Sequence, residues 1–346
     1  MSFLVGAILT QDGLTNGAIY ALIALALVMV FSVTRVILVP QGEIITFAAL
    51  TLASLRQGLL PGTVYVICAA GLVAAAVELW SYVRKDRSPE RLKFALLYAG
   101  LPLAASALTV ASLGRGFGIW FDMAVMMLLV VPMGPLMYRL AFRPLGDASV
   151  LLNLIVAVAV HFVLMGIGLL AFGAEGVRTP PIVPGRLPIF GVPFSIQAMF
   201  VIAVAVVTIV AMAVFFGRTL HGKALRATAF NRTGARLVGI RTESAGFLAF
   251  LLAGIMGALC GLLAAPITTI YYDTGFLIGL KGFIAAIFAG LASYPLAAVG
   301  ALLVGLLESY SAFFASTYKD AIVFALIIPI LLWRSLRSHH IEEEEE

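Results

Sequence analysis

The stretch LTNGAIYALIALALVMVFSVT runs from residue 14 to residue 34 without a charged side chain. An α-helix rises about 1.5 Å per residue, so about 20 apolar residues cross the roughly 30 Å hydrocarbon layer of a bilayer. The stretch therefore has the length and the composition of a membrane-spanning helix.

Similar apolar runs recur along nearly the whole chain. We expect full or partial spans at 14–34, 41–60, 64–83, 93–113, 119–138, 150–172, 196–216, 244–265, 276–292, 295–315 and 319–333. The runs at 41–60, 276–292 and 319–333 are short or interrupted by Gly or Pro, which is typical of re-entrant segments. The sequence predicts an all-α, polytopic transmembrane helical bundle with about nine to eleven spans, some of them re-entrant.

The composition supports a single membrane domain over residues 1–346. The chain is 62% hydrophobic and 11% charged, whereas a soluble domain is about half apolar and about a quarter charged. The net charge of +5 resides mainly in short loops between apolar runs, which indicates orientation in a lipid bilayer and no nucleic-acid partner. Cys68 and Cys260 lie inside apolar runs and lack His or Cys at metal-ligand spacing, so we expect neither a disulfide nor a metal site.

Lys and Arg mark the cytoplasmic side of a membrane protein. Basic clusters at 84–93, 139–143 and 217–243 are separated by even numbers of predicted spans, so all three can face the cytoplasm. The Pro-rich loop 173–195 and the segment 266–275 then face outward. Residues 334–346 form a cytoplasmic tail, and its final Glu342–Glu346 run is expected to be a solvated end.

The cytoplasmic segment 217–243 reads GRTLHGKALRATAFNRTGARLVGIRTE. Its small and apolar residues recur at helical spacing, and Gly234 and Gly239 interrupt the pattern. This predicts a short amphipathic helix, a turn and re-entry into the membrane. The segment is either an ordinary positive loop or a helix that docks in a groove of a soluble partner.

Residues GKALRATAFNRTGARLVGI within this segment resemble the cytoplasmic coupling loop of permease subunits of high-affinity branched-chain amino-acid ABC importers. The resemblance extends to TNGAIYALIALALVMVFSVTRVILVPQGE, to FRPLGDASVLLNLIVAVAV, and to GLKGFIAAIFAGLASYPLAAVGALLVGLLES and STYKDAIVFALIIPILL, in the family's order. It covers most of the chain outside 60–138. It implies that the coupling contacts to an ATPase are made by Gly222, Arg226, Ala227, Asn231, Ala235 and Gly239.

The resemblance implies a multi-pass permease of the bacterial inner membrane that imports branched-chain or other hydrophobic amino acids by alternating access. Its partners would be a second related permease in a heterodimer, two ATPase subunits and a periplasmic substrate-binding protein. ATP and Mg²⁺ would bind to the ATPases, since this chain lacks a G-x-x-x-x-G-K-[ST] loop. The chain itself would hold no cofactor and no catalytic residue, and would not be an enzyme.

This sequence departs from the family pattern in several places, and two of them concern the predicted path and the topology. The usual Asn-Phe-Ala-His-Gly-Glu element reads Leu38, Val39, Pro40, Gln41, Gly42, Glu43, with Gln at the His position. Residues 60–138 contain about one more helical hairpin than the family pattern, which adds an even number of crossings and keeps the remaining topology.

Charged side chains inside apolar runs cost at least about 2.5 kcal/mol at mid-membrane and indicate function. Glu43 follows a helix-breaking Pro and Gly, so we expect Gln41, Gly42 and Glu43 to line or gate a hydrated path. The alternative for Glu43 is a buried, hydrogen-bonded structural acid. Glu308 is expected to pair with Lys281 in the same path or to extend toward the interface. His161 is alone in its run and is expected to be a hydrogen-bonded core histidine, while Asp320 is expected to anchor a span end.

Small residues recur every four positions in two of the predicted spans. Ala253, Gly257 and Gly261 form one such stripe, and Ala301 and Gly305 form another. Small residues at this spacing let transmembrane helices approach closely, so we expect both stripes to lie at helix contacts.

Three alternatives to an amino-acid importer remain open. Permeases for urea or short amides resemble the same family. An ion-coupled secondary carrier would need several intramembrane acids, and Glu43 and Glu308 are few. A membrane-embedded enzyme would require a catalytic pair, for which His161 has no evident partner in the sequence.

Overall fold

The computed structural model describes residues 3–84, 89–146, 148–189 and 192–337. Its elements, in chain order, are α1 (Phe3–Thr34), α2 (Gln41–Arg56), α3 (Thr63–Arg84), α4 (Pro89–Ser112), α5 (Ile119–Val130), α6 (Met133–Met137), the π-helix η1 (Tyr138–Phe142), the 3₁₀-helix η2 (Arg143–Leu145), α7 (Val150–Phe172), β1 (Arg186–Ile189), β2 (Val192–Ser195), α8 (Ile196–Arg218), α9 (Leu220–Phe230), α10 (Arg232–Leu237), α11 (Thr242–Ala264), α12 (Thr274–Phe288), α13 (Tyr294–Phe314), the 3₁₀-helix η3 (Ser316–Tyr318), α14 (Lys319–Ala325) and α15 (Ile327–Arg337). Within the described ranges, eight helices are long and apolar enough to cross a membrane. The predicted all-α polytopic bundle is confirmed.

The three runs that were predicted to be short or broken form the shorter helices. Helix α2 has 16 residues and α12 has 15, and the run 319–333 is divided between α14 and α15. Pro329 explains the division, because a proline ring collides with the carbonyl group four residues earlier, and α14 ends at that residue, Ala325. Residues 334–337 of the predicted tail extend α15, and residues 338–346 lie outside the described ranges.

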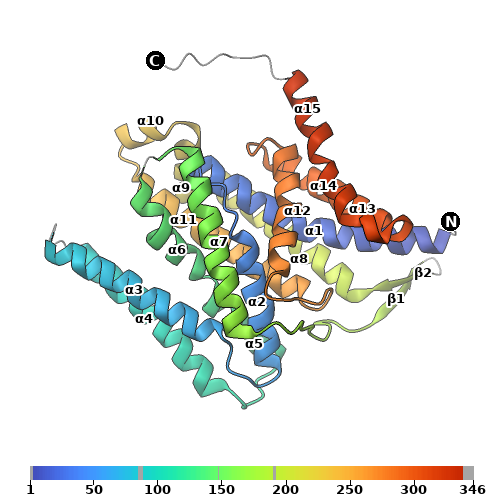
Figure 1. Cartoon of the computed structure of the whole chain (residues 1–346), viewed down its shortest axis with the longest axis horizontal. Coiled ribbons are helices and arrows are strands. Elements are labelled where there is room, and N and C mark those ends of the chain that lie inside the picture. Colours follow the sequence, from blue (N-terminus) through green and yellow to red (C-terminus); the bar gives the residue numbers. More distant parts are fainter. Residues whose placement is uncertain (1–2, 85–88, 147, 190–191, 338–346) are drawn as a thin grey trace.

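Helix α1 runs through the middle of the bundle (Figure 1) and contacts α8, α11, α12 and α13. Its most apolar window is 89% buried. A helix that is apolar on all sides can be covered by other helices on all sides. This explains why the stretch 14–34 forms the centre of the molecule.

Glycines allow α1 and α13 to lie almost in backbone contact. A Cβ atom at Gly13 would lie 2.8 Å from Leu306 Cα, and one at Gly17 would lie 2.9 Å from Leu302 Cα. From the other side, a Cβ atom at Gly305 would overlap the backbone of Gly13 and Gly17. The stripe of Ala301 and Gly305 lies at this contact.

The second stripe of small residues, on α11, faces α2. A Cβ atom at Gly257 would lie 2.8 Å from Ile44 Cγ2, and one at Gly261 would lie 2.6 Å from Ala48 Cβ. The carbonyl oxygen of Ala253 accepts a hydrogen bond from Gln41 Nε2 at 3.0 Å. The α11 stripe therefore holds α2 against the central helices.

Helices α3 and α4 pack against each other and project from one side of the molecule (Figure 1). They occupy the predicted extra hairpin region, 60–138. Lys85 and Arg87 of its predicted basic cluster lie outside the described residues. Glu78 of α3, which is almost fully buried, pairs with Arg139 of η1 at 2.5 Å and with Arg143 at 3.2 Å. The hairpin is thus tied to the bundle by an ion pair that the sequence did not reveal.

Replacing Gly305 by Ala is expected to lower the thermal stability of the detergent-purified protein, because the added methyl group would force α1 and α13 apart. Overpacking of this kind costs about 1–3 kcal/mol. Gly166→Ala is the matched control, since a Cβ atom at Gly166 would have no neighbour within 4 Å and Ala favours helix by about 1 kcal/mol over Gly. If Gly305→Ala and Gly166→Ala unfolded at the same midpoint temperature, the result would contradict the close packing of α1 and α13.

Candidate functional site

The backbones of α2 and α12 cross at two glycines. A Cβ atom at Gly42 would lie 2.9 Å from Phe276 Cα, and Gly275 N donates a hydrogen bond to Thr46 Oγ1 at 2.9 Å. Helix α2 begins at Gln41, directly after Pro40, because a proline disfavours the helical conformation at the residue that precedes it. This crossing brings the N-terminal turns of two short helices together inside the bundle.

Glu43, in the first turn of α2, forms a hydrogen bond with His161 of α7. The distance between Glu43 Oε1 and His161 Nδ1 is 2.6 Å, and both residues are buried. The His161 ring stacks on Phe276 of α12, with centroids 4.4 Å apart. The histidine is hydrogen-bonded, as a core histidine is expected to be, and its partner is a predicted pathway residue 118 positions away. The two residues join α2 and α7 beside α12.

Gln41 and Glu43 extend toward different helices. Gln41 Nε2 donates to the carbonyl oxygen of Ala253 on α11, whereas Glu43 contacts α7. Gln41 Oε1 and Glu43 Oε2 are buried, and neither accepts a hydrogen bond from another described residue. Two unused acceptors near the α2–α12 crossing give this region a polar interior that can accept hydrogen bonds.

Lys281 and Glu308 form a second polar cluster. Lys281 Nζ contacts Glu308 Oε1, and the Tyr20 hydroxyl group donates to Glu308 Oε2. Asp320 Oδ1 lies 2.9 Å from Lys281 Nζ. Asp320, which we expected to be an anchor at a span end, therefore also neutralises a buried lysine. The cluster joins α1, α12, α13 and α14.

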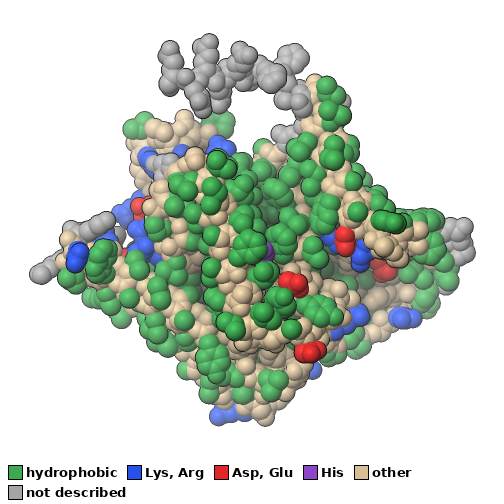
Figure 2. Space-filling view, in the orientation of Figure 1, with side chains coloured by type: hydrophobic (Ala, Val, Ile, Leu, Met, Phe, Trp, Pro, Cys, Tyr) green, Lys and Arg blue, Asp and Glu red, His purple; other side chains and the backbone are tan. Residues whose placement is uncertain are grey.

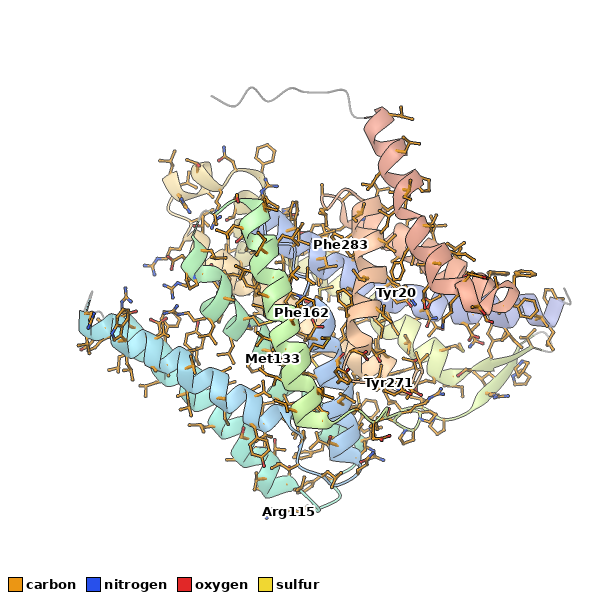
Figure 3. The ribbon with its side chains drawn as sticks, in the orientation of Figure 1. Tyr20, Arg115, Met133, Phe162, Tyr271 and Phe283 are labelled. Atoms are coloured by element: carbon orange, nitrogen blue, oxygen red, sulfur yellow. The ribbon has the colours of Figure 1, made fainter. Side chains whose placement is uncertain are left out.

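The predicted pathway residues thus belong to two clusters that share α12. Gly275 and Phe276 of α12 face Glu43 and its neighbours, and Lys281 faces Glu308. In Figure 3, Phe283 of α12 and Tyr20 of α1 lie close together in the upper half of the bundle, and Phe162 of α7 lies to the left of and below Phe283. A shift of α12 would change the surroundings of both clusters.

The loops that were predicted to face outward lie side by side. Val177 and Ile270 form a backbone bridge, and Arg178 Nε donates to the Pro266 carbonyl oxygen at 3.1 Å. Instead of remaining irregular, the Pro-rich loop also contains the antiparallel hairpin β1–β2, in which Arg186 is opposite Ser195. Figure 2 shows acidic and basic side chains together between α13 and this hairpin, on a face that is otherwise mostly apolar.

These loops border a cavity of about 810 Å³, which we call the outer cavity. Its lining includes Asp12 and Asn16 of α1, Arg178 and Arg186, Gln197 of α8, and Glu308 and Lys319. Glu308 belongs to the Lys281 cluster, so that cluster forms part of the cavity wall. A polar cavity thus extends from the predicted outer face to a predicted pathway residue.

The cytoplasmic segment 217–243 contains two short helices, α9 and α10. Thr219 Oγ1 accepts a hydrogen bond from Gly222 N at 3.0 Å, and Asn231 Oδ1 accepts one from Gly234 N at 2.8 Å. Each side chain caps the first turn of the helix that follows it. Gly239 ends α10 with a φ of 86°, a conformation that favours glycine. The prediction of one helix and a turn missed α10.

The predicted coupling residues divide into buried and exposed ones. Gly222 packs against the backbone of Phe215 and Phe216, and Ala235 is also buried. Arg226, Ala227, Asn231 and Gly239 are exposed. Large apolar side chains accompany them on the surface: Leu220 is 82%, Phe230 93%, Leu237 84% and Val238 76% exposed. We call these four residues the apolar coupling patch.

Comparison with known proteins identifies the family. The family model described as the branched-chain amino acid transport system / permease component matches residues 96–331. The permease protein BraD of Pseudomonas aeruginosa, named for high-affinity branched-chain amino acid transport, is 27% identical over 330 residues, which cover 93% of this chain and 92% of that protein.

Two further relatives are similar to this chain over different shares of its length. LivH of Escherichia coli K12, whose name also specifies high-affinity branched-chain amino acid transport, is 26% identical over 93% of this chain and 91% of its own length. The autoinducer 2 import permease LsrC of Yersinia enterocolitica is 34% identical over 35% of this chain and 32% of its own length. The chain therefore belongs to the branched-chain amino acid transport system permease family, as a multi-pass inner-membrane transport subunit of importers that also contain ATPase and substrate-binding partners.

Proposed function

We propose that this permease imports hydrophobic amino acids, with branched-chain amino acids as its principal cargo. The observation that carries the proposal is the similarity to BraD and LivH over 93% of the chain. Both names specify branched-chain amino acid transport. The outer cavity, which contains acidic, basic and apolar groups, fits a cargo with charged termini and an apolar side chain.

The proposed assembly contains a second related permease in a heterodimer, two ATPase subunits and a periplasmic substrate-binding protein. The apolar coupling patch supports the contact with an ATPase, because large exposed apolar side chains with polar surroundings are typical of protein interaction sites. Phe230 would be the main anchor, since aromatic side chains often contribute most of the binding energy at an interface.

ATP and Mg²⁺ are proposed to bind to the partner ATPases and not to this chain. Gly217, Gly222 and Lys223 match the glycines and the lysine of a phosphate-binding loop, but Ala224 stands where the Ser or Thr that holds Mg²⁺ would be. Gly217 lies in the last turn of α8, and Gly222 and Lys223 lie in the first turn of α9, so these residues do not form a loop between a strand and a helix.

In the proposed mechanism, movement of the ATPases is transmitted through α9. This helix contacts α1, α8 and α11. Gly282 of α12 packs against Ile23 of α1, and Gly257 of α11 packs against Ile44 of α2. A displacement of α9 can therefore reach both sides of the α2–α12 crossing. Glu43 and Gln41 would act as gating residues there, and Lys281 and Glu308 would line the path.

Vesicles that contain the complete transporter are expected to accumulate leucine, isoleucine or valine when the binding protein and ATP are supplied. The measurement is uptake of labelled solutes, with urea, acetamide and autoinducer 2 tested in parallel. Saturating uptake of one of these three solutes, without uptake of hydrophobic amino acids, would contradict the proposed cargo. Uptake that continues without ATPase subunits and follows an ion gradient would contradict the mechanism.

Phe230→Asp is expected to reduce the affinity for the ATPase subunits at least about tenfold, because a charge would replace an apolar anchor. Phe230 is almost fully exposed, so the variant should insert and fold normally. Phe117→Asp, at an exposed aromatic residue outside the coupling segment, is the control. Normal co-purification of the ATPases with Phe230→Asp would place the docking contact elsewhere.

His161→Leu is expected to destabilise the protein by about 3–5 kcal/mol, because it leaves the Glu43 carboxylate group buried without its partner. The double variant Glu43→Gln/His161→Leu removes the charge and should recover most of the thermal stability. If the pair acts in gating, the double variant will remain deficient in uptake although it is folded. Normal uptake by the stable double variant would show that the pair is only structural.

A further inference from the structure

The side chain of Gln197 is the best-defined recognition group in the outer cavity. Its Oε1 atom accepts hydrogen bonds from the backbone N–H groups of Ile182 and Val183, at 2.9 and 3.1 Å. Because N–H groups donate to the amide oxygen and not to the amide nitrogen, these two contacts distinguish Oε1 from Nε2 in the Gln197 side chain. The orientation of the Gln197 side chain is therefore fixed by the loop that borders the cavity.

Gln197 is only 7% exposed, and its Nε2 atom is buried without an acceptor among the described residues. An amide NH₂ group carries two donors, and leaving a buried polar group unpaired costs about 1–3 kcal/mol. Proteins rarely retain such a group unless a ligand or an ordered water satisfies it. An acceptor that enters the outer cavity from outside the protein would satisfy this unused donor.

Arg178 supplies a positive charge to the same cavity. Its Nε atom is held by the Pro266 carbonyl oxygen, and no other hydrogen bond of this side chain is formed with the described residues. The Nη groups are therefore left as donors. A guanidinium group and an amide NH₂ group together are suited to a carboxylate ligand, which offers two acceptor oxygens.

Asp12 supplies a negative charge that is not neutralised within the described part of the protein. The other carboxylate group of the outer cavity, Glu308, already accepts from Lys281 and Tyr20. Asp12 lines the cavity and has no ion-pair partner among the described residues. It is the acid that remains available for a positively charged group.

Apolar side chains complete the lining. Val183, Pro184 and Ile267 border the cavity together with the charged groups. They offer a surface against which a branched aliphatic side chain can pack, and such burial is favourable by about 25 cal/mol per Å².

We propose that the outer cavity receives the cargo as a zwitterion, with its α-carboxylate group at Gln197 and Arg178 and its α-ammonium group at Asp12. This assignment rests on the proposed function and specifies the α-amino acid termini as the recognised groups. It explains how the permease can discriminate against urea and short amides, which have neither charge.

The test uses a diazirine analogue of leucine, which keeps both charged termini and carries the photoreactive group on its side chain. The complete transporter in vesicles is supplied with binding protein loaded with this analogue, illuminated during turnover, and digested for mass spectrometry. We expect labelling of residues 181–184 and 266–268. We expect Gln197→Glu, Arg178→Gln and Asp12→Asn each to reduce this labelling at least about tenfold.

Gln197→Glu is the sharpest variant, because it retains an oxygen for Ile182 and Val183 while it replaces the donor by a second oxygen that repels a carboxylate ligand. Asp273→Asn, an exposed outward acid that does not line the outer cavity, is the charge-matched control for Asp12→Asn. Labelling should remain at the wild-type level in this control. The affinity of the substrate-binding protein for the transporter is measured for every variant, so that a loss of labelling caused by poor docking is recognised.

Two results would overturn the inference. If vesicles take up leucine normally but the label lies only outside these segments, or is unchanged in all three variants, the inference fails and the proposed function stands. If vesicles take up no hydrophobic amino acid, the proposed function fails and the inference fails with it.

Discussion

The cost of an unpaired charge in a low-dielectric interior organises this protein. Each buried acid or base must find a partner, because an isolated charge inside the protein or the bilayer is expensive. Glu43 finds His161, Glu308 finds Lys281, and Glu78 finds Arg139. The Glu43–His161 and Glu78–Arg139 pairs join segments that are far apart in the sequence, and the Glu308–Lys281 pair joins the consecutive helices α12 and α13. The pairs therefore fix the arrangement of the bundle as much as they serve function.

Close packing at small residues is the complementary constraint. Apolar helices gain little from the hydrophobic effect when they associate in lipid, so they depend on close contact. Gly13, Gly17 and Gly305 provide it between α1 and α13, and Gly42 and Gly275 provide it between α2 and α12. The second contact lies directly beside Glu43. The small residues therefore position the polar clusters, because a bulkier residue at Gly42 or Gly275 would separate the helices that carry them.

The sequence predicted the features that depend on local composition. Apolar length located the helices, and the three runs that were short or broken became α2, α12 and the divided α14–α15. The Gly and Ala stripes were visible as four-residue repeats. The pairing of Glu43 with His161 could not be predicted in this way, because helix registers and neighbours decide which side chains meet. The same reason applies to Glu78 with Arg139, and to Asp320, whose partner Lys281 lies on another helix.

Gln41, at the start of α2, stands where the family pattern has a histidine. The family pattern has His two residues before the acid of this element, and this chain has Gln there. Gln41 does not contact Glu43 but extends to the Ala253 carbonyl group on α11. The imidazole beside Glu43 comes from His161 of α7 instead. The acid at the start of α2 thus has its hydrogen-bond partner on a different helix. Relative movement of α2 and α7 would separate the two groups.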